Sequence, residues 1–585
     1  MNRNIAFFIS SNKEKNKDFL SAKNHFFNIA NEFGYKIFSL ETKTLKIFIT
    51  AEKKVTVTRR KDFIKFPVGN LGENSTKNDR FLEIIISDNT VTITNDYAGS
   101  IPTYFSLKKY ISLSNIEPCV ILDSSTKQSD ISYENTYGFM RYSHFIWDET
   151  LYEHIFTVLP DSEYIFNVKK LSFHPRYLQT VKSSQTNVGL SDKEIATKLN
   201  ELNDRLIYQS LSKYDQIILP LSSGYDSRMI LASVSKNKNL KNKLQCFTYG
   251  SIGSVEVEAG RRLTKKLGVK WKFLDLPLHY LTKKYLFNTH DIFGSSLHMH
   301  GMYQLEFFDE IKKMINVQKN SCLTSGFMTG VPAGQHNGLL SINKSTTSLT
   351  DIMNKFSQSR YWTDDELMKL EAFKNKNYRA KTEERFQLAF NRFDGKVYQK
   401  AVMFDIWTRQ RNFISYYPRI LEWKIPTISP HMNPDYANFF MSLSKKHLNN
   451  RYAVELMFIN YYPKLSKIVS NSNGLKSIDG HLDNIMFFCS RIFKRFKIHY
   501  LIPKKYAKNR FEFDLSALRL TGKDSIYPLL RKDKKTASFI NEIIIYKDID
   551  KLYQAAYKGK LAAYGKLLTI QSIALSMLKI KKYES

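Results

Sequence analysis

Residues 1–183 are dominated by a period-two alternation of apolar and polar side chains. The stretches 43–58 and 81–97 show it most clearly, and such alternation is typical of strands with one buried face. Within the second stretch, the polar residues 87–90 (SDNT) separate two apolar-rich halves, which predicts a β-hairpin. We therefore predict a β-rich domain over residues 1–183, followed by a polar linker over 183–194.

A helical period of apolar residues replaces the alternation beyond this linker. Ser191 and Glu194 have the spacing of a capping box, and Ile195, Leu199 and Leu206 then fall on one helix face. Strand-like apolar segments next alternate with helical ones, as in a parallel sheet covered on both faces. The predicted strands are 216–221, 244–250, 269–276 and 320–326, and the helices that follow the first two are 226–236 and 254–268.

This alternation predicts an α/β domain over residues 184–470, built on a doubly wound parallel sheet. From about residue 330 onward the pattern is mainly helical. A polar break over 470–480 precedes a basic segment rich in aromatic residues. We therefore predict a third region, a basic helical C-terminal extension over residues 471–585.

The corner between the first predicted strand and its helix carries the sequence Ser-Ser-Gly-Tyr-Asp-Ser, residues 222–227. In open parallel sheets, ligands bind beyond the carboxyl ends of the strands, where a helix N-terminus favours an anion. Gly224 would allow close backbone approach, whereas Asp226 would repel a bare phosphate unless it held Mg²⁺. The corner therefore predicts a site for magnesium pyrophosphate. The alternative is an ordinary turn, with Asp226 as a first-turn acid.

The stretch 221–228 (LSSGYDSR) resembles the SGGxDS pyrophosphate loop of the asparagine synthetase family, whose relatives include β-lactam synthetases and lasso-peptide cyclases. Further motifs follow in the family's order. They lie at 247–276, at 323–336 (LTSGFMTGVPAGQH, like SGEGSDELFGGY), at 405–443 and at 449–468, where the family has K-x-x-L-R. In the first domain, residues 95–107 (NDYAGSIPTYFSL) resemble RDxxGxxPLYY, and residues 148–167 resemble the element that closes the family's glutaminase-like domain.

The resemblance implies an ATP-pyrophosphatase (PP-loop) domain behind a degenerate Ntn-like glutamine amidotransferase domain, with ATP and Mg²⁺ as cofactors. Asp226 would be the metal ligand, and Asp226 and Arg451 would be the catalytic residues. His336 and His431 are alternative proton carriers, although a lone histidine is more often structural. The residues implied to hold the nucleotide are Leu221, Ser222, Ser223, Gly224, Asp226, Ser227, Tyr249, Ser325 and Gly326.

Four departures from the family pattern bear on activity. Asn2 stands where the family has its cysteine nucleophile, and Ser223 replaces the first glycine of the loop. Gly330 and Val331 stand where the second loop has Asp-Glu, and Arg451 replaces a lysine. We therefore expect no glutamine hydrolysis, so that the amine would come from free ammonia, a separate glutaminase or the substrate itself.

Three functions remain open at this point. The first is an ATP-dependent ligase that adenylates a carboxylate, on a small molecule, sugar or peptide, for attack by ammonia or an amine. The second is a catalytically impaired relative that acts as a binding or scaffold protein. The third follows from the segment 491–510, which mixes cations with aromatic residues and could contact an anionic membrane surface, unless it is a helix docked on the protein.

Bulk composition adds limits to these hypotheses. The chain has 585 residues with a formal net charge of +33, which attracts anions, but the lysines are scattered and we expect no nucleic-acid partner. Its four cysteines lie far apart, which argues against zinc and against a disulfide framework. No apolar run approaches the roughly 18 residues of a membrane span, and the N-terminal apolar stretch is short for a signal peptide. We therefore expect a cytoplasmic protein.

Overall fold

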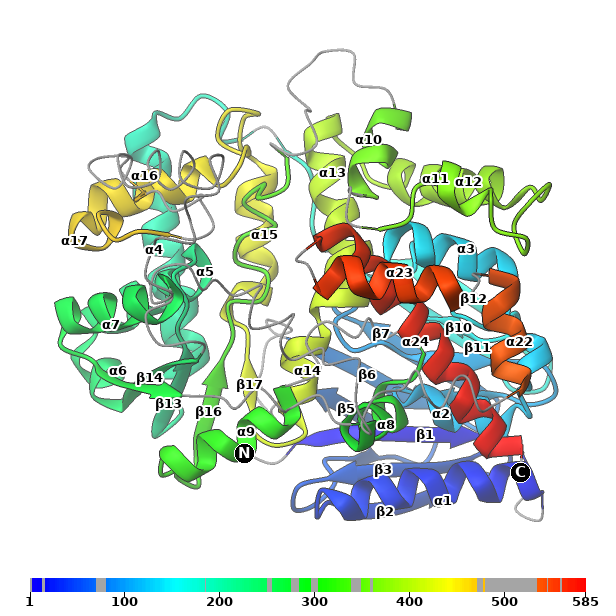
Figure 1. Ribbon diagram of the computed structural model, residues 1–585. Coiled ribbons are helices and arrows are strands. Elements are labelled where there is room, and N and C mark those ends of the chain that lie inside the picture. The colour runs from blue at the N-terminus through cyan, green and yellow to red at the C-terminus, as the bar shows by residue number, and fades with distance from the viewer. Residues whose placement is uncertain are drawn as a thin grey trace.

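The computed structural model in Figure 1 describes most of the chain. The described residues are 3–12, 16–69, 80–184, 186–249, 255–274, 283–295, 304–337, 349–357, 361–470, 477–478, 534–543, 546–557 and 560–584. The segment 491–510 lies outside them, so its predicted contact with an anionic surface stays a prediction.

The N-terminal part forms two antiparallel six-stranded sheets that pack face to face. Apolar side chains from both sheets, among them Phe7, Ile49, Phe66 and Ile84, fill the space between them. The first sheet has the order β10 (Phe156–Thr157), β8 (Tyr104–Ser106), β9 (Ser112–Ser114), β1 (Asn4–Ser10), β3 (Lys46–Ala51), β2 (Lys36–Glu41). The second has the order β12 (Ser172–Tyr177), β11 (Ser162–Asn167), β7 (Thr90–Asn95), β6 (Phe81–Ile86), β5 (Ile64–Gly69), β4 (Thr58–Arg59). The pairing of β6 with β7 confirms the predicted hairpin.

Helices also occur in this part, where the sequence pattern indicated only strands. They are α1 (Lys17–Glu32), α2 (Glu117–Asp123), η1 (Gln128–Asp130) and α3 (Tyr133–Tyr142). In α1, Phe19, Ala22, Phe26 and Ile29 recur at helical spacing and are buried in one core with Phe8 of β1. This helix therefore covers the outer face of the first sheet.

The second part contains a five-stranded sheet in which every pairing is parallel. Its order is β15 (Lys270–Leu274), β14 (Leu244–Tyr249), β13 (Gln216–Pro220), β16 (Ser321–Thr324), β17 (Thr427–Ile428). The chain thus begins at the central strand, adds β14 and β15 on one side, and then crosses to the other side. The predicted α/β region with a parallel sheet is confirmed. The two-residue strand β17 was not predicted, because it is too short to produce a pattern.

Helices cover both faces of the parallel sheet. Ile217 and Leu219 of β13 lie in one core with α4 (Asp192–Leu211), α5 (Tyr225–Lys236) and α7 (Val255–Leu267). Ile218 points to the opposite face, where it meets α9 (Gln304–Met314) and α14 (Tyr416–Glu422). Ser191 caps α4 with Glu194, as predicted. The remaining helices before the C-terminal region are α6 (Lys238–Lys243), α8 (Lys283–Phe293), α10 (Leu349–Phe356), α11 (Asp364–Leu367), α12 (Tyr378–Asn391), α13 (Val397–Asp405), the π-helix η2 (Ile406–Ile414), η3 (Pro430–Met432), α15 (Pro434–Met441), α16 (Tyr452–Tyr461) and α17 (Pro463–Ser466).

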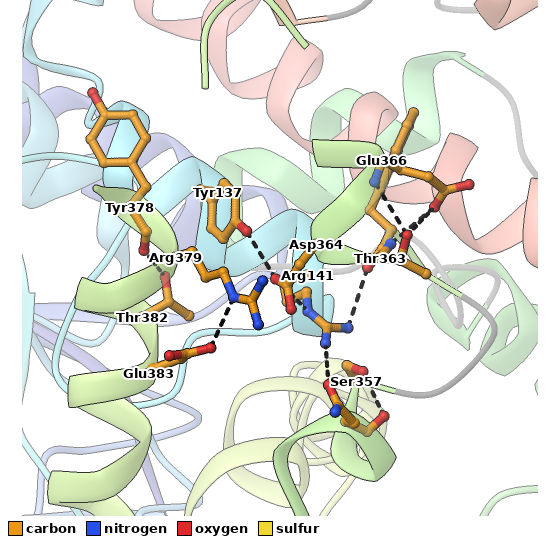
Figure 2. A network of polar contacts seen from close by, with 12 residues as sticks. Tyr137, Arg141, Ser357, Thr363, Asp364, Glu366, Tyr378, Arg379, Thr382 and Glu383 are labelled. Atoms are coloured by element: carbon orange, nitrogen blue, oxygen red, sulfur yellow. Dashed lines mark hydrogen bonds and ion pairs between the residues drawn. The ribbon is translucent and has the colours of Figure 1, made fainter. Parts of the chain in front are cut away.

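A polar network attaches α3 to α10 and α11, which come after the second loop, the segment 325–336 that follows β16 (Figure 2). Asp364 accepts hydrogen bonds from Tyr137 Oη at 2.8 Å and from Arg141 Nε at 2.9 Å. Arg141 also donates to Asn354 of α10 at 3.1 Å. Since Arg141 and Asp364 lie mostly buried, this ion pair joins the two parts of the chain in a protected environment.

A second connection runs through η2. The buried Arg411 guanidinium donates to Trp147 O at 3.0 Å and to Val158 O at 3.0 Å in the β-rich part. At the C-terminus, α22 (Lys534–Ile543), α23 (Tyr546–Tyr557) and α24 (Leu561–Glu584) return to the β-rich part, where α24 packs against α3 and α8 (Figure 1). None of the described helices combines the length and apolar character needed to cross a membrane.

Candidate functional site

The strand-to-helix corner lies where the order of the parallel sheet reverses. Strand β13 ends at Pro220 and helix α5 begins at Tyr225, so residues 221–224 form the turn between them. Strands β14 and β16 lie on opposite sides of β13 in the sheet. This reversal is the point at which open α/β sheets bind ligands, and it is where the sequence placed the site.

The turn is held by hydrogen bonds to its own backbone amides. Ser222 N donates to Ser227 Oγ at 3.0 Å, and Gly224 N donates to Ser222 Oγ at 3.1 Å. Ser223 N donates to the carboxylate of Glu256, in the first turn of α7, at 2.6 Å. The Glu256 carboxylate therefore accepts the hydrogen bond from Ser223 N that the prediction assigned to pyrophosphate. Leu221 is fixed by Phe247 O at 2.8 Å and contributes only its backbone to the turn.

Asp226 is the second residue of α5, and of the corner residues 222–227 it alone has a buried side-chain atom without a hydrogen-bond partner. Its Oδ1 is buried and has no hydrogen-bond partner within the described structure. Burial raises the pKa of this carboxyl, and the charges of Arg451 and His336 offset part of the rise. A buried carboxylate oxygen without a donor carries an energetic penalty that a bound cation or donor would remove.

The second loop meets the first at Asp226. A Cβ atom on Gly326 would lie 2.7 Å from Asp226 Cβ, and one on Gly330 would lie 3.0 Å from Asp226 Oδ1. Any larger residue at either position would press on this carboxylate. Ser325 begins the loop at the carboxyl end of β16, where its amide donates to Ile428 O at 2.7 Å. The structure therefore brings Gly326 and its neighbour Ser325, which the resemblance assigns to the same site as Asp226, close to that residue.

Arg451 lies beside this pair of loops. It precedes α16 with a positive φ of 64°, and its amide donates to Ala333 O of the second loop at 3.1 Å. The guanidinium lies 4.4 Å from the centre of the Tyr225 ring, and its buried Nε has no hydrogen-bond partner within the described structure. A buried cation with an unused donor faces the same region as the unpaired oxygen of Asp226.

Tyr249 and Val331, two further residues singled out from the sequence, lie among apolar side chains. Tyr249 is the last residue of β14, half-buried, and packs against the apolar cluster on the side of α9. Val331 is buried in the main core, so an acid at that position would sit among apolar side chains. Val331 therefore acts as a packing residue of the second loop.

The two candidate proton carriers have different surroundings. His431 is fully buried, its Nδ1 and Nε2 are bonded to Thr329 Oγ1 and Asn203 Oδ1, and burial lowers its pKa to about 3. Both ring nitrogens are occupied, so His431 is structural. His336 is partly exposed, and its Nδ1 hydrogen-bonds the carboxylate of Asp405.

Sequence reasoning missed Arg228, the residue that closes the LSSGYDSR motif. Its guanidinium is fully buried and donates to Ser223 O at 2.6 Å, and also to Leu465 O and Ile468 O at 3.0 and 2.9 Å. It therefore ties the turn to the end of α17. An arginine one turn into an apolar helix was the available signal, because a buried guanidinium needs several carbonyl acceptors.

Among the described residues, no group of three or more histidine, cysteine, aspartate or glutamate side chains is arranged to hold a metal ion. In the part of the chain that the structure describes, Asp226 is the carboxylate that offers an unpaired buried oxygen at the two-loop junction. One carboxylate suits a magnesium ion whose other ligands are phosphate oxygens and water.

Comparisons with known proteins give little beyond the geometry. No family model matches the chain, and no curated protein matches it. A solved structure described as that of the allosteric regulatory enzyme of purine biosynthesis is 8% identical, covers 48% of this chain and 82% of its own, and has a TM-score of 0.20. At that TM-score the likeness carries no argument about fold or function.

Proposed function

We propose that this protein is an ATP-dependent carbon–nitrogen ligase of the asparagine synthetase type, with a PP-loop ATP site at the turn after β13. The observation that carries the proposal is the unpaired, buried Oδ1 of Asp226, set where two loops leave neighbouring parallel strands. Beside it lies the buried guanidinium of Arg451, also with a free donor. A carboxylate and a cation together suit a magnesium-bound polyphosphate better than either suits a bare anion.

In this proposal the chain adenylates a carboxylate and releases pyrophosphate. Asp226 would hold Mg²⁺, which supplies charge neutralisation for the phosphates. Arg451 would donate to the departing pyrophosphate, and Ser325 and Gly326 would lie along the acyl-adenylate. The amides of residues 222–224 would bind phosphate oxygens once the Glu256 carboxylate moves away from Ser223 N. Tyr249 would lie beside the adenine.

The amine is expected to come from outside the β-rich part. Thioester chemistry of the family's kind needs an accessible cysteine with a nearby base, and the three cysteines that the structure describes, Cys119, Cys246 and Cys322, are buried. We therefore expect no glutamate release when purified protein is incubated with glutamine, ATP and an acceptor. Sustained release at about 1 per second, an ordinary enzymatic rate, would contradict this expectation.

The proposal is tested by ATP–pyrophosphate exchange across a panel of carboxylates that includes aspartate, uronic acids and peptide carboxylates. Exchange with at least one of them is expected from wild type and not from Asp226→Asn, which removes the charge and keeps the side-chain shape. Glu258→Gln, on the exposed face of α7, is a matched control that should exchange normally. Equal exchange in wild type and Asp226→Asn would contradict the assignment of Asp226.

A second candidate function is a binding or scaffold protein without catalysis. The observation in its favour is that the amides of residues 222–224 already have acceptors, so the turn is complete without a ligand. Under this alternative MgATP would bind to wild type and to Asp226→Asn equally weakly, and no carboxylate would support exchange. Calorimetric titration with MgATP distinguishes the two functions.

A further inference from the structure

We propose that His336 takes the proton from the attacking amine, and that Asp405 is the residue that positions it. This inference rests on the proposed function, since it concerns the second half-reaction of the same site. It extends the proposal by defining the acceptor as an amine that is protonated at neutral pH, either ammonium or a primary alkylamine.

Asp405 fixes which nitrogen of His336 can act as a base. The Asp405 carboxylate is buried at the end of α13 and also accepts from Gln410 Nε2 at 3.3 Å. Burial alone would disfavour the charged carboxylate, but the His336 imidazole beside it lowers the pKa of Asp405, so that it is ionised. An ionised carboxylate only accepts hydrogen bonds, so Nδ1 of His336 must carry the donated proton. In the neutral ring this leaves the lone pair on Nε2.

His336 reaches this place because of the second loop. Gln335 precedes it, donates its amide to Gly330 O at 3.1 Å, and places its side chain where a Cβ of Gly330 would stand. Gly330 in turn lies against Asp226. His336 therefore stands on the same loop that contacts the proposed phosphate site, and its partly exposed ring is held by an acid from another element.

The surrounding charges come from several elements. His336 acts on the carboxylates of Asp226 and Asp405, and Arg451 also acts on Asp226. Arg409 of η2 acts on Asp405, as it does on the buried His144, whose pKa burial lowers to about 3.

The step balances as follows. Nε2 of His336 removes one proton from the ammonium group, and the neutral nitrogen attacks the carbonyl carbon of the acyl-adenylate. The new carbon–nitrogen bond forms while the carbon–oxygen bond to the phosphate breaks, and its electron pair leaves with AMP. The second proton of the nitrogen passes to the AMP phosphate, and the imidazolium then loses its proton to water. No oxidant or reductant is involved.

The experiment compares two half-reactions in His336→Gln, which can still accept or donate at the same place but cannot act as a base. ATP–pyrophosphate exchange should stay within about twofold of wild type, whereas amide formation from ammonia should fall by roughly 100-fold or more, the usual contribution of a general base. Hydroxylamine is largely unprotonated at neutral pH, so hydroxamate formation by the variant should stay near the wild-type rate.

Asp405→Asn should show the same selectivity to a smaller degree, falling roughly 10-fold with ammonia and little with hydroxylamine. A purely structural role of Asp405 would instead lower both reactions and the exchange together. His154→Gln, a partly exposed histidine bonded to Thr126, is the matched control and should leave all three rates unchanged. If His336→Gln forms amide from ammonia at the wild-type rate, the inference is wrong. If wild type shows no exchange with any carboxylate, the proposed function fails instead.

Discussion

At the scale of single residues, the junction between Asp226 and Gly330 is the most informative place in the molecule. Gly330 has no side chain that could contact the Asp226 carboxylate. A Cβ atom at this position would lie 3.0 Å from Asp226 Oδ1 and 2.1 Å from the flexible end of the Gln335 side chain. An acid at position 330 would form a repulsive pair with the Asp226 carboxylate, which a bound cation would relieve. The stability of such a variant with and without Mg²⁺ therefore tests whether a cation binds at this junction.

We predict that Gly330→Asp lowers the thermal midpoint in the absence of divalent ions and that millimolar Mg²⁺ restores it. The expected recovery is about 2 kcal/mol, the linkage effect of a ligand present at tens of times its Kd. Gly189→Asp, at an exposed glycine with no atom near its Cβ position, should show no Mg²⁺ response. A Gly330→Asp protein that is equally stable with and without Mg²⁺ would place the cation, if any, elsewhere.

At the scale of elements, the attachment of α3 to α11 contrasts with a similar pair on the protein surface. Arg141 and Asp364 are mostly buried, with 7% and 17% of their side chains exposed, whereas Arg379 and Glu383 of α12 are 50% and 36% exposed (Figure 2). Both pairs have hydrogen-bond distances near 3 Å. The difference in burial decides their contributions, because removing one partner of a buried pair leaves an uncompensated charge.

We predict that Arg141→Ala costs on the order of 3 kcal/mol and that Arg379→Ala costs about 0.5 kcal/mol or less. The measurement is hydrogen exchange of peptides from α11 and α12. Arg141→Ala should accelerate exchange of the α11 peptide by roughly 100-fold, since opening this region becomes easier by that free energy. Equal protection in the two variants would mean that the Asp364 network does not hold the helices together.

The elements also show how far the sequence alone can predict the fold. Strands β13, β14, β15 and β16 were predictable because apolar-rich strand segments alternate with helical segments along this part of the chain. Helix α1 was not predicted, because residues 1–183 as a whole were interpreted as β-rich and the helical spacing of Phe19 and Phe26 was not recognised. Strand β17 is a two-residue edge whose pairing with β16 depends on tertiary contacts.

The candidate site was predictable to the same extent. The spacing of Asp226 and its neighbours located the corner, because a strand-to-helix turn has its own composition. No local pattern could place Glu256 against Ser223 N or Asp405 against His336, since each pair is joined across distant segments. Sequence patterns report what a residue does within its own element, and these contacts are made between elements.

At the scale of the whole molecule, the chain closes on itself through α24, which packs against α3 and α8 of regions far earlier in the sequence. One contact in this closure is sensitive to protons. His290 of α8 is buried and hydrogen-bonds Ser576 Oγ of α24 through Nε2 at 3.2 Å. Burial lowers its pKa to about 3, with a further lowering from Lys579 and a smaller opposing effect of Asp291. Lys579 is itself paired with Asp291 at 2.6 Å.

The sign of the pH effect follows from this shift. The ordinary pKa of histidine is 6.5, so the unfolded or opened segment binds the proton at a higher pH than the closed one. The stability that His290 contributes is therefore present above pH 6.5 and is lost as the pH falls toward 3. Asp123 of α2, whose pKa burial raises to about 6, has the opposite sign and offsets part of the global loss below pH 6. Hydrogen exchange of the α24 amides reports on the local effect of His290, separately from the effect of Asp123 on global stability.

We predict that protection of the α24 amides, corrected for intrinsic exchange rates, falls by roughly 30-fold between pH 7 and pH 5, because 1.5 pH units below the free histidine pKa are worth about 2 kcal/mol. His290→Gln can keep the hydrogen bond to Ser576 but cannot take up a proton, so its α24 protection should change little over the same range. Ser576→Ala is the complementary control, since it removes the hydrogen bond and leaves the pH dependence. If wild type and His290→Gln lose protection in parallel as the pH falls, the proton-sensitive contact lies elsewhere, and α24 is held independently of the charge on His290.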